Sequence, residues 1–228
     1  MTNYPIEKIT KGCEQLIEES LKDVNGRYQS WEHCYSIFAL SKGKRLTSEQ
    51  EDTLCLHLGF YLASWGMMRG SSQLLQKGYK VHKKAVKELM KEEYSDLWAV
   101  RCERFCGYDH ELDKLFVLYV RLCKIYQGFG VSATDTLITK ILMGTLGCTP
   151  AYDRIFNAGV KGKSGSYLTF NRKSIVALSR FYVEHHNELE RLREFASLKS
   201  INQVEYPQMK ILDMCFWQMG AKMDAKSN

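Results

Sequence analysis

The sequence predicts an all-α protein, folded as a single irregular bundle of about nine to eleven helices over residues 1–228. Apolar residues recur every three or four positions along most of the chain, which is the spacing of helices buried on one side. Prolines occur only at Pro5, Pro150 and Pro207, so long stretches are free to be helical. A 45% hydrophobic content in 228 residues is sufficient for a sizeable core.

The eleven expected helices are bounded by residues that commonly start or end helices. Thr47 is expected to cap the start of the most apolar helix. Asn25 with Gly26, and Gly147 with Pro150 three residues later, are typical of helix ends. In chain order the helices are expected over residues 6–24, 28–40, 54–68, 73–76, 80–91, 94–104, 109–127, 137–146, 152–160, 174–198 and 206–220. Residues 54–68, 112–127 and 137–146 should be the most buried. One domain is the simplest organisation, with 161–166 as the loop at which two helical lobes would divide.

The composition favours a cytoplasmic protein with no membrane segment and no cofactor. The first residues lack the basic flank and apolar run of a secretory signal, and the longest apolar stretch, residues 54–68, is shorter than the roughly twenty residues of a membrane span. Eight cysteines without such a signal are expected to be free thiols. Cys102, Cys106 and His110 are spaced by four residues, but Gly107 interrupts the helix that would align them, so no metal site is predicted.

The main candidate for nucleic-acid binding is a row of lysines in the helix expected over residues 80–91. At 100° per residue the row falls on one face, opposite an apolar face. Ammonium groups so arranged can follow a phosphate backbone, and a net charge of +6 permits such a partner. An ordinary solvated helix face is the alternative. The row consists of Lys80, Lys84, Lys87 and Lys91, flanked by Lys83.

A second basic area is expected around the loop at 161–166. Gly162, Lys163 and the serine after them resemble part of a phosphate-binding loop. That pattern requires a further glycine five residues before Gly162, where this chain has Asn157, so a nucleotide loop is excluded. A surface linker or a loose contact with an anion remains. The basic residues of this area are Lys161, Lys163, Arg172 and Lys173.

Arg180 and His185 form an R-x4-H arrangement within the expected helix 174–198. This spacing resembles the R-x4–6-H motif of the HEPN domains, a class of helical ribonucleases. The resemblance implies that Arg180 would stabilise phosphate charge and that His185 would transfer a proton. Phe181 stands where that family usually carries a polar residue, and a chance match to so short a motif is the alternative.

Residues 139–153 are expected to form a helix, a tight turn and a second helix, and this segment resembles the helix-hairpin-helix DNA glycosylases. The resemblance implies that Gly144 and Gly147 would form a hairpin that grips phosphate through backbone N–H groups. It also implies catalytic roles for Lys140 and Asp153. In that family the lysine follows the hairpin, whereas here it precedes it. The alternative is a glycine-capped helix end, with Asp153 in the first turn of the next helix.

The remaining large side chains are interpreted as core. Trp65, Trp98 and Trp217 fall on apolar helix faces, and buried packing is the usual role of such residues. The leading hypothesis from the sequence is therefore binding of DNA or RNA through the lysine row. A nuclease or glycosylase is the enzymatic alternative. A third reading is a protein-interaction module that binds a protein partner, or a second copy of this chain, through the methionine-rich C-terminal helix.

Overall fold

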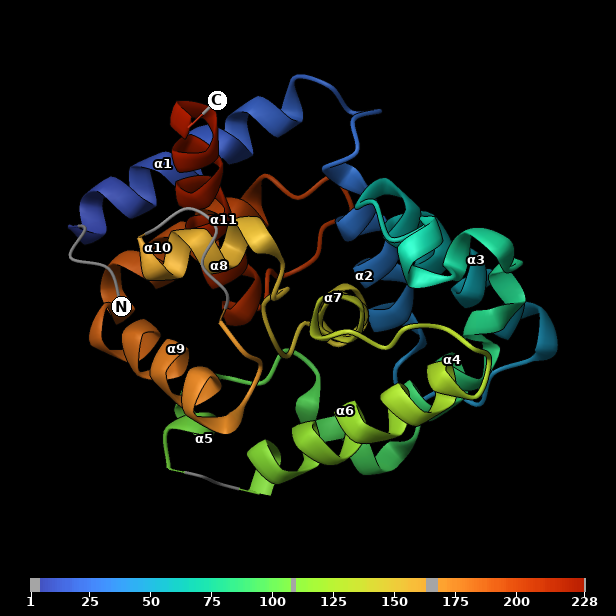
Figure 1. Cartoon of the computed structure of the whole chain (residues 1–228). Coiled ribbons are helices and arrows are strands. Elements are labelled where there is room, and N and C mark those ends of the chain that lie inside the picture. The colour runs from blue at the N-terminus through green and yellow to red at the C-terminus, as the bar shows by residue number, and fades with distance from the viewer. Residues whose placement is uncertain (1–4, 108–109, 163–167, 228) are drawn as a thin grey trace.

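The computed structural model describes residues 5–107, 110–162 and 168–227, which form helices and no strand. Figure 1 shows the eleven α-helices of this part of the chain, in agreement with the all-α class that the sequence predicts. They are α1 (Ile6–Leu21), α2 (Gln29–Ser41), α3 (Ser48–Ser64), α4 (Lys83–Leu89), α5 (Glu103–Cys106), α6 (His110–Gln127), α7 (Asp135–Thr145), α8 (Arg154–Lys161), α9 (Arg172–Glu184), α10 (His186–Leu198) and α11 (Gln208–Ser227). Four short 3₁₀ helices accompany them: η1 (Gly70–Ser72), η2 (Leu74–Gln76), η3 (Tyr79–His82) and η4 (Glu92–Leu97).

Helix α7 lies at the centre of the molecule, where Figure 1 shows it end-on with the other helices around it. Every residue from 137 to 145 is buried, as the apolar run predicts. Gly144 allows the ring of Tyr61 from α3 to pack directly on the α7 backbone, because a side chain at this position would overlap that ring. None of the helices in the described ranges is long and apolar enough to cross a membrane.

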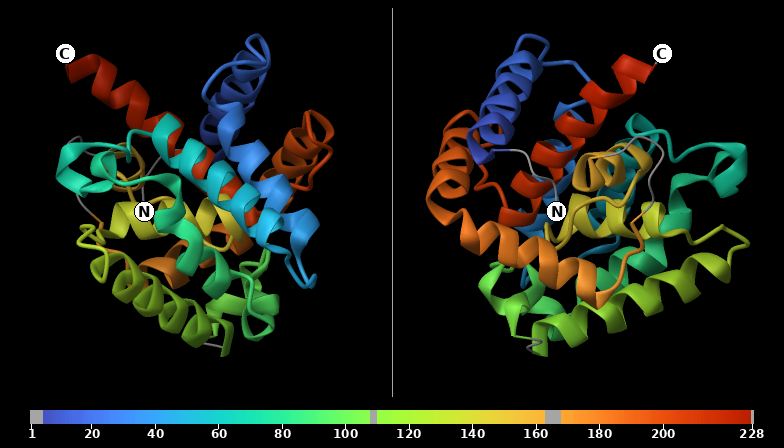
Figure 2. Two further views of the ribbon diagram at one scale, coloured as in Figure 1. Left: turned by 90° about the vertical axis from the view of Figure 1, so that its right-hand side faces the viewer. Right: turned by 60° about the vertical axis from the view of Figure 1, so that its left-hand side comes forward.

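Helices α8 and α11 cross at two glycines. A Cβ atom on Gly159 would overlap the backbone carbonyl of Phe216, and one on Gly220 would overlap that of Ile155. The two backbones are therefore in contact, which only glycine permits on both sides. The sequence prediction that α11 ends at Gly220 is wrong for this reason: the glycine is a packing residue, and the helix continues to Ser227. Figure 2 shows this last part of α11 projecting beyond the body of the molecule.

Three other helix predictions are also corrected. Residues 94–104 are not one helix, because the 3₁₀ helix η4 ends at Leu97 and α5 begins at Glu103. Residues 80–91 are not one helix, because the 3₁₀ turn η3 precedes the short α4, which ends at Leu89. The long helix expected over residues 174–198 is broken at His185, whose φ of −115° and ψ of 34° separate α9 from α10. The start of α3 is confirmed: Thr47 and Gln50 form a capping box, which satisfies backbone N–H groups at the end of the helix.

His82 lies in the core with part of its hydrogen-bonding capacity unused. Its Nδ1 is 2.8 Å from the Tyr126 hydroxyl, while Nε2 is buried without a partner in the described part of the chain. Burial lowers the pKa of His82 to about 4, because the imidazolium would lose its hydration. The folded protein therefore keeps His82 neutral at pH values at which the unfolded chain takes up a proton.

The first prediction concerns the α8–α11 crossing. Replacing Gly159 by alanine should destabilise the protein by about 2 kcal/mol or more, because the added carbon forces the two helices apart. Helix propensity alone predicts a gain of about 1 kcal/mol from the same change. Chemical denaturation distinguishes the two signs. Gly70→Ala is the matched control, since a Cβ there has no neighbour within 4 Å, and a stability of Gly159→Ala equal to that of the wild type would contradict the close crossing.

The second prediction is an acid sensitivity that depends on His82. Because its pKa is lower in the folded state than in the unfolded state, stability falls as pH falls from about 6.5 towards 4. Between about pH 6.5 and pH 5 the wild type should lose about 2 kcal/mol more than His82→Asn, which does not titrate. Denaturant titrations of both proteins at several pH values measure the difference, and parallel curves for the two proteins would exclude a neutral buried His82.

Candidate functional site

A buried ion pair joins α7 to the start of α8. Lys140 Nζ lies 2.9 Å from Asp153 Oδ2, and the side chains are 3% and 17% exposed. The other carboxylate oxygen of Asp153 accepts a hydrogen bond from the N–H of Phe156 (2.9 Å) and so caps α8. A lysine this deeply buried needs a paired anion. The sequence predicts Lys140 and Asp153 as one possible enzymatic pair, and the structure places these two side chains in contact.

A second buried ion pair lies on α11. Lys210 Nζ is 3.2 Å from Asp213 Oδ2, and each side chain is 8% exposed. The N–H of Ala151 donates to Asp213 Oδ1 (3.0 Å). Burial raises the pKa of the Asp213 carboxyl, against the opposing effect of Lys210. One short segment, residues 151–153, therefore takes part in both ion pairs. The backbone N–H of Ala151 binds Asp213, and Asp153 is itself the partner of Lys140.

Three half-buried aromatic rings meet beside these ion pairs. Tyr28 precedes α2, Trp65 follows α3 and Trp217 belongs to α11. Their ring centroids are 5.8 Å apart for Tyr28 and Trp65, 6.1 Å for Tyr28 and Trp217, and 5.8 Å for Trp65 and Trp217, and every pair is edge-to-face. The sequence interpretation of Trp65 and Trp217 as ordinary core is corrected, because both rings are partly exposed and face a hollow.

The hollow and the first ion pair share the Trp65 ring. Lys140 Nζ lies 5.2 Å from the centroid of this ring, and Lys210 Nζ lies 4.7 Å from that of Trp31. Both contacts are at cation–π distance. The cavity of the hollow measures about 40 Å³. Its lining includes Tyr28, Trp31, Trp65, Lys210, Asp213 and Trp217.

Two hydrogen-bond donors near the hollow lack acceptors. The indole nitrogen of Trp65 and the hydroxyl of Tyr61 are both buried without a partner in the described residues. Buried donors are rarely left unpaired in folded proteins, and an unfilled one costs roughly 1–3 kcal/mol. The N–H of Trp65 is itself buried, so a bound molecule would reach it only after movement of the ring.

Arg27 lies at the edge of the same aromatic group. The carbon of its guanidinium group lies 5.5 Å from the Tyr28 ring centroid and 5.2 Å from that of Trp65, and the residue is exposed. The site thus combines flat aromatic surfaces, buried polar groups and one exposed positive charge beside them. Planar, polar and anionic molecules match these three features.

The hairpin expected at Gly144 and Gly147 does not form a phosphate site. All residues from 141 to 152 are buried, and Gly147, with φ +64°, lies against Pro207. Its N–H donates to the carbonyl of Leu142 (3.0 Å). The glycine therefore serves a tight internal turn, which returns the chain so that Asp153 reaches Lys140.

Helix α3 places two carboxylates beside three lysines of the row and so neutralises part of its charge. Lys83 and Lys87 lie 3.4 and 3.3 Å from the carboxylate of Glu51, and Lys80 lies 4.0 Å from Asp52. Each of these lysines remains at least partly exposed. Exposed pairs of this kind contribute little to stability, but they lower the net charge that a phosphate backbone would meet.

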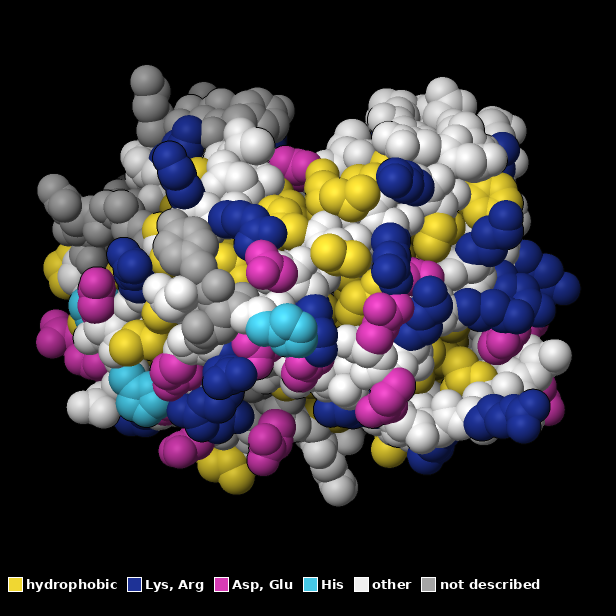
Figure 3. All heavy atoms as spheres, turned by 90° about the horizontal axis from the view of Figure 1, so that it is seen from below, with side chains coloured by type: hydrophobic (Ala, Val, Ile, Leu, Met, Phe, Trp, Pro, Cys, Tyr) yellow, Lys and Arg dark blue, Asp and Glu magenta, His cyan; other side chains and the backbone are white. Residues whose placement is uncertain are grey.

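The other members of the row are also engaged. Lys91 lies 2.7 Å from Glu88, and Lys84 Nζ lies 5.2 Å from the centroid of Phe129. Figure 3, which views the molecule from below, shows acidic side chains among the basic ones across the middle of that face. The geometry therefore gives this row less support as a phosphate site than its spacing suggests.

The basic residues expected at 161–173 are dispersed. Lys161 ends α8 and is exposed, whereas Lys163 lies outside the described residues. Arg172 forms an ion pair with Asp113 of α6 (2.5 Å), and Lys173 is exposed at the start of α9. Arg172 is thus paired with a different helix rather than directed to an anion beside the loop.

Arg180 and His185 engage different neighbours. Arg180 is exposed and donates to the backbone carbonyl of Cys106 (3.4 Å). His185 lies at the break between α9 and α10, with its ring 4.7 Å from that of Phe181. His185 thus ends α9 rather than lying within one long helix, and the ribonuclease arrangement stays a prediction.

All eight cysteines are free thiols. In the described ranges no group of three or more His, Cys, Asp or Glu residues is placed to hold a metal ion. Comparison with known proteins gave no match: no family model fits the chain, and no curated protein or solved structure resembles it significantly. The site therefore has to be interpreted from its own chemistry.

The third prediction uses the unequal burial of the Lys140–Asp153 pair. Asp153→Asn keeps a helix cap but leaves a buried ammonium group unpaired, and should cost about 3–5 kcal/mol. Lys140→Met removes the more buried charge and leaves the more exposed carboxylate, so it should cost less. The double variant should recover part of the loss. Denaturant unfolding of the three variants measures these differences, and purely additive effects would show that the two charges do not depend on each other.

Proposed function

We propose that this protein is a nucleic-acid-processing enzyme that takes a base out of a strand and releases it by cleaving the N-glycosidic bond. The observation that carries the proposal is the Trp65 ring, which lines the aromatic hollow and has Lys140 Nζ 5.2 Å from its centroid. Lys140 and its partner Asp153 lie beside the hollow and are not part of its lining. This proposal is the glycosylase alternative that the sequence suggests. Its support is the aromatic hollow beside the buried ion pair, and not a phosphate-binding hairpin.

The residues of the hollow are of the kinds that bind a nucleobase. Its cavity of about 40 Å³ is smaller than the roughly 150 Å³ that holds benzene, so the proposal requires the rings to move apart when a base enters. Enzymes that act on a base extrude it into a pocket, where it stacks on aromatic side chains and forms hydrogen bonds along its edge. Trp65, Trp217 and Tyr28 supply the rings, each of which can contribute roughly 1–3 kcal/mol to stacking. Asp213 and Lys210 in the lining supply an acceptor and a donor. Arg27 would meet a backbone phosphate beside the extruded base.

The reaction would be hydrolytic. Water oxygen forms a bond to the sugar C1′, and the bond from C1′ to the base nitrogen breaks. The bonding electron pair leaves on the base, which takes up a proton. Asp153 would accept the proton of the attacking water, and its carboxylate would oppose the positive charge that develops on the sugar. Lys140 would hold this carboxylate in place through the 2.9 Å contact.

Phosphate-backbone binding by the lysine row stays a prediction of the sequence. Its support is the exposure of Lys80, Lys83 and Lys87, and the ion pairs with α3 weigh against it. A base-releasing enzyme would also need contacts to the strand, so the two proposals are compatible. A cytoplasmic location, in which thiols stay reduced, suits eight free cysteines.

The fourth prediction is base release. DNA duplexes each carrying one uracil, hypoxanthine, 8-oxoguanine or 3-methyladenine are incubated with the protein. Free base is measured by mass spectrometry, and abasic strands by alkaline cleavage on a denaturing gel. At least one duplex should lose its base, and the Lys140→Met/Asp153→Asn double variant should be slower by about 100-fold or more.

The control is Lys83→Glu/Lys87→Glu, which changes charge on the surface of α4 and leaves the site intact. This variant should release base at nearly the wild-type rate if the aromatic hollow is the site, and should lose strand binding if the lysine row contacts the backbone. Circular dichroism establishes that each variant is folded. The proposal is wrong if folded wild-type protein releases none of these bases, or if the double variant is as fast as the wild type.

A further inference from the structure

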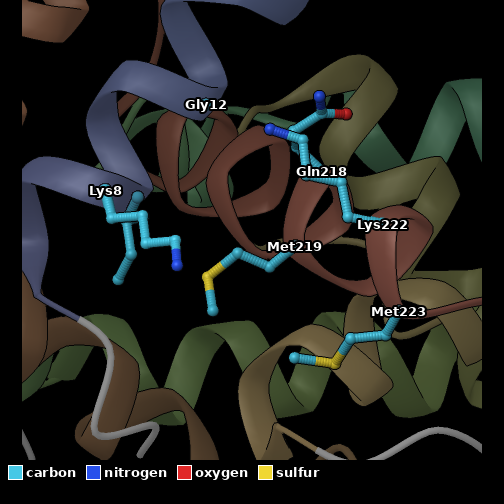
Figure 4. Close-up of a pocket in the computed structure, with 7 residues that line it drawn as sticks. Lys8, Gly12, Gln218, Met219, Lys222 and Met223 are labelled. Carbon is cyan, nitrogen blue, oxygen red and sulfur yellow. The ribbon is translucent and has the colours of Figure 1, made fainter. Parts of the chain in front are cut away.

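A groove lies along the segment between α10 and α11, residues 199–207. It consists of two hollows of about 420 and 550 Å³, and Val204 and Glu205 line both of them. The hollow between α1 and α11, into which Lys8 and Met219 point in Figure 4, is smaller at about 180 Å³. The groove is also larger than the aromatic hollow, so it has room for a bound molecule without movement of the chain.

The main chain of this segment is held on one side by α10 and the residues just after it. The N–H of Val204 donates to the Ser200 hydroxyl (2.9 Å). The N–H of Tyr206 donates to the Ser197 hydroxyl (2.9 Å), and its carbonyl accepts a hydrogen bond from Arg193 (3.5 Å). Val204 and Tyr206 are half-buried, and the residue between them is exposed. This alternation is that of an extended strand, in which every second residue faces the same way.

Glu205 presents the opposite edge of this strand. Neither its N–H nor its carbonyl forms a hydrogen bond within the described ranges. In an antiparallel pair of strands, such a residue exchanges two hydrogen bonds with one residue of the neighbouring strand. Pro207 has no N–H, so pairing along this edge centres on Glu205. A peptide that adds itself as a strand gains main-chain hydrogen bonds, and its alternate side chains enter the pockets beside it.

Two residues of the groove hold a left-handed backbone conformation that non-glycine residues rarely adopt. Ala99, with φ 47°, lines the first hollow, and Gln203, with φ 56°, lines the second. Among the described non-glycine residues, only Gln73 shares a positive φ. Such conformations are unfavourable and concentrate at binding sites, where the surrounding structure maintains them. Their occurrence in both hollows favours a binding role for the groove.

The charge available in the groove is negative. Its two arginines, Arg101 and Arg193, each have a carboxylate within 3.1 Å. The side chain of Glu205 is 91% exposed and lies 3.9 Å from Arg193, and Glu194 is a second exposed carboxylate of the lining. Leu198, which is 85% exposed, adds apolar surface to the second hollow. A peptide with both basic and apolar side chains is complementary to this lining.

We propose that the groove binds an extended segment of a partner protein, which pairs with Glu205 as an added strand. An apolar side chain of this segment enters the first hollow, beside Tyr35 and Ala39 of α2. A basic side chain contacts the carboxylates of Glu194 and Glu205. Main-chain pairing provides the affinity, and the two carboxylates select basic sequences. This partner site is independent of the proposed base release.

Random twelve-residue peptides displayed on phage are the probe, and they are selected against the full chain. Selected peptides are synthesised with a fluorescent label and titrated by fluorescence anisotropy. They should combine apolar residues with lysine or arginine and bind with a Kd at or below about 100 μM. Methylation of the peptide N–H that donates to Glu205 should weaken binding at least about fivefold, because a main-chain hydrogen bond is lost. Selected peptides without basic residues, or peptides insensitive to methylation at every position, would overturn the proposal.

Two substitutions at one residue separate main-chain pairing from charge. Glu205→Pro removes the N–H and suits an extended chain, whereas Glu205→Gln removes only the charge. The proline variant should bind the selected peptides at least about fivefold more weakly than the glutamine variant. The matched control is Glu184→Gln, an exposed carboxylate of α9 outside the groove, which should leave Kd within about twofold. Thermal unfolding establishes that the variants are folded, and the methylated peptides test the pairing without altering the protein.

Hydrogen exchange locates the added strand on the wild-type protein. The Glu205 amide should exchange at least about tenfold more slowly with a selected peptide bound, because pairing protects its N–H. Three results would contradict the site: no peptide is selected, the Glu205 amide gains no protection, or the two Glu205 variants bind equally well.

Discussion

The buried ion pair between Lys140 and Asp153 is the interaction on which the arrangement of the site depends. An ammonium group in the core is tolerated only with an anion in contact, since an isolated buried charge loses several kcal/mol of hydration. The chain must therefore turn back after α7 so that Asp153 reaches Lys140, and Gly147 permits that turn. The same turn of the chain brings the N–H of Ala151 to Asp213, and this hydrogen bond holds α11 against residues 151–153. Trp217 on α11 and Trp65 beside Lys140 then meet as neighbours.

Stability alone does not account for this arrangement. Buried ion pairs are often no more stabilising than apolar residues of the same volume, and this core carries two such pairs, which the segment from Ala151 to Asp153 connects. The neighbouring hydrogen-bond donors of Trp65 and Tyr61 are also unpaired in the described structure. Groups of this kind are commonly retained at functional sites, where local stability is given up for chemistry.

Much of the fold follows from the sequence, because apolar spacing and capping residues act locally. The all-α class, the buried α7 and the capped start of α3 were predictable in this way. The site was not, since Tyr28, Trp65 and Trp217 come from three separate segments and apolar spacing does not distinguish a buried ring from one at a hollow. The ion pairs of the lysine row were not predictable for a similar reason, because Glu51 is some thirty residues away from Lys83 in the sequence. Lys140 and Asp153 were proposed from the resemblance of residues 139–153 to the helix-hairpin-helix glycosylases, although the turn between them is a buried one rather than a phosphate-binding hairpin.

The most direct test of the account is where a nucleobase contacts the protein. A DNA strand carrying 5-iodouracil is bound to the protein and irradiated, and the cross-linked peptides are sequenced by mass spectrometry. The account predicts cross-links at Trp65, Trp217 or Tyr28, and their loss when the competing strand contains the base that the enzyme releases. Cross-links confined to α4 or its neighbour η3, with none at the three rings, would contradict it and would favour the lysine row as the nucleic-acid surface.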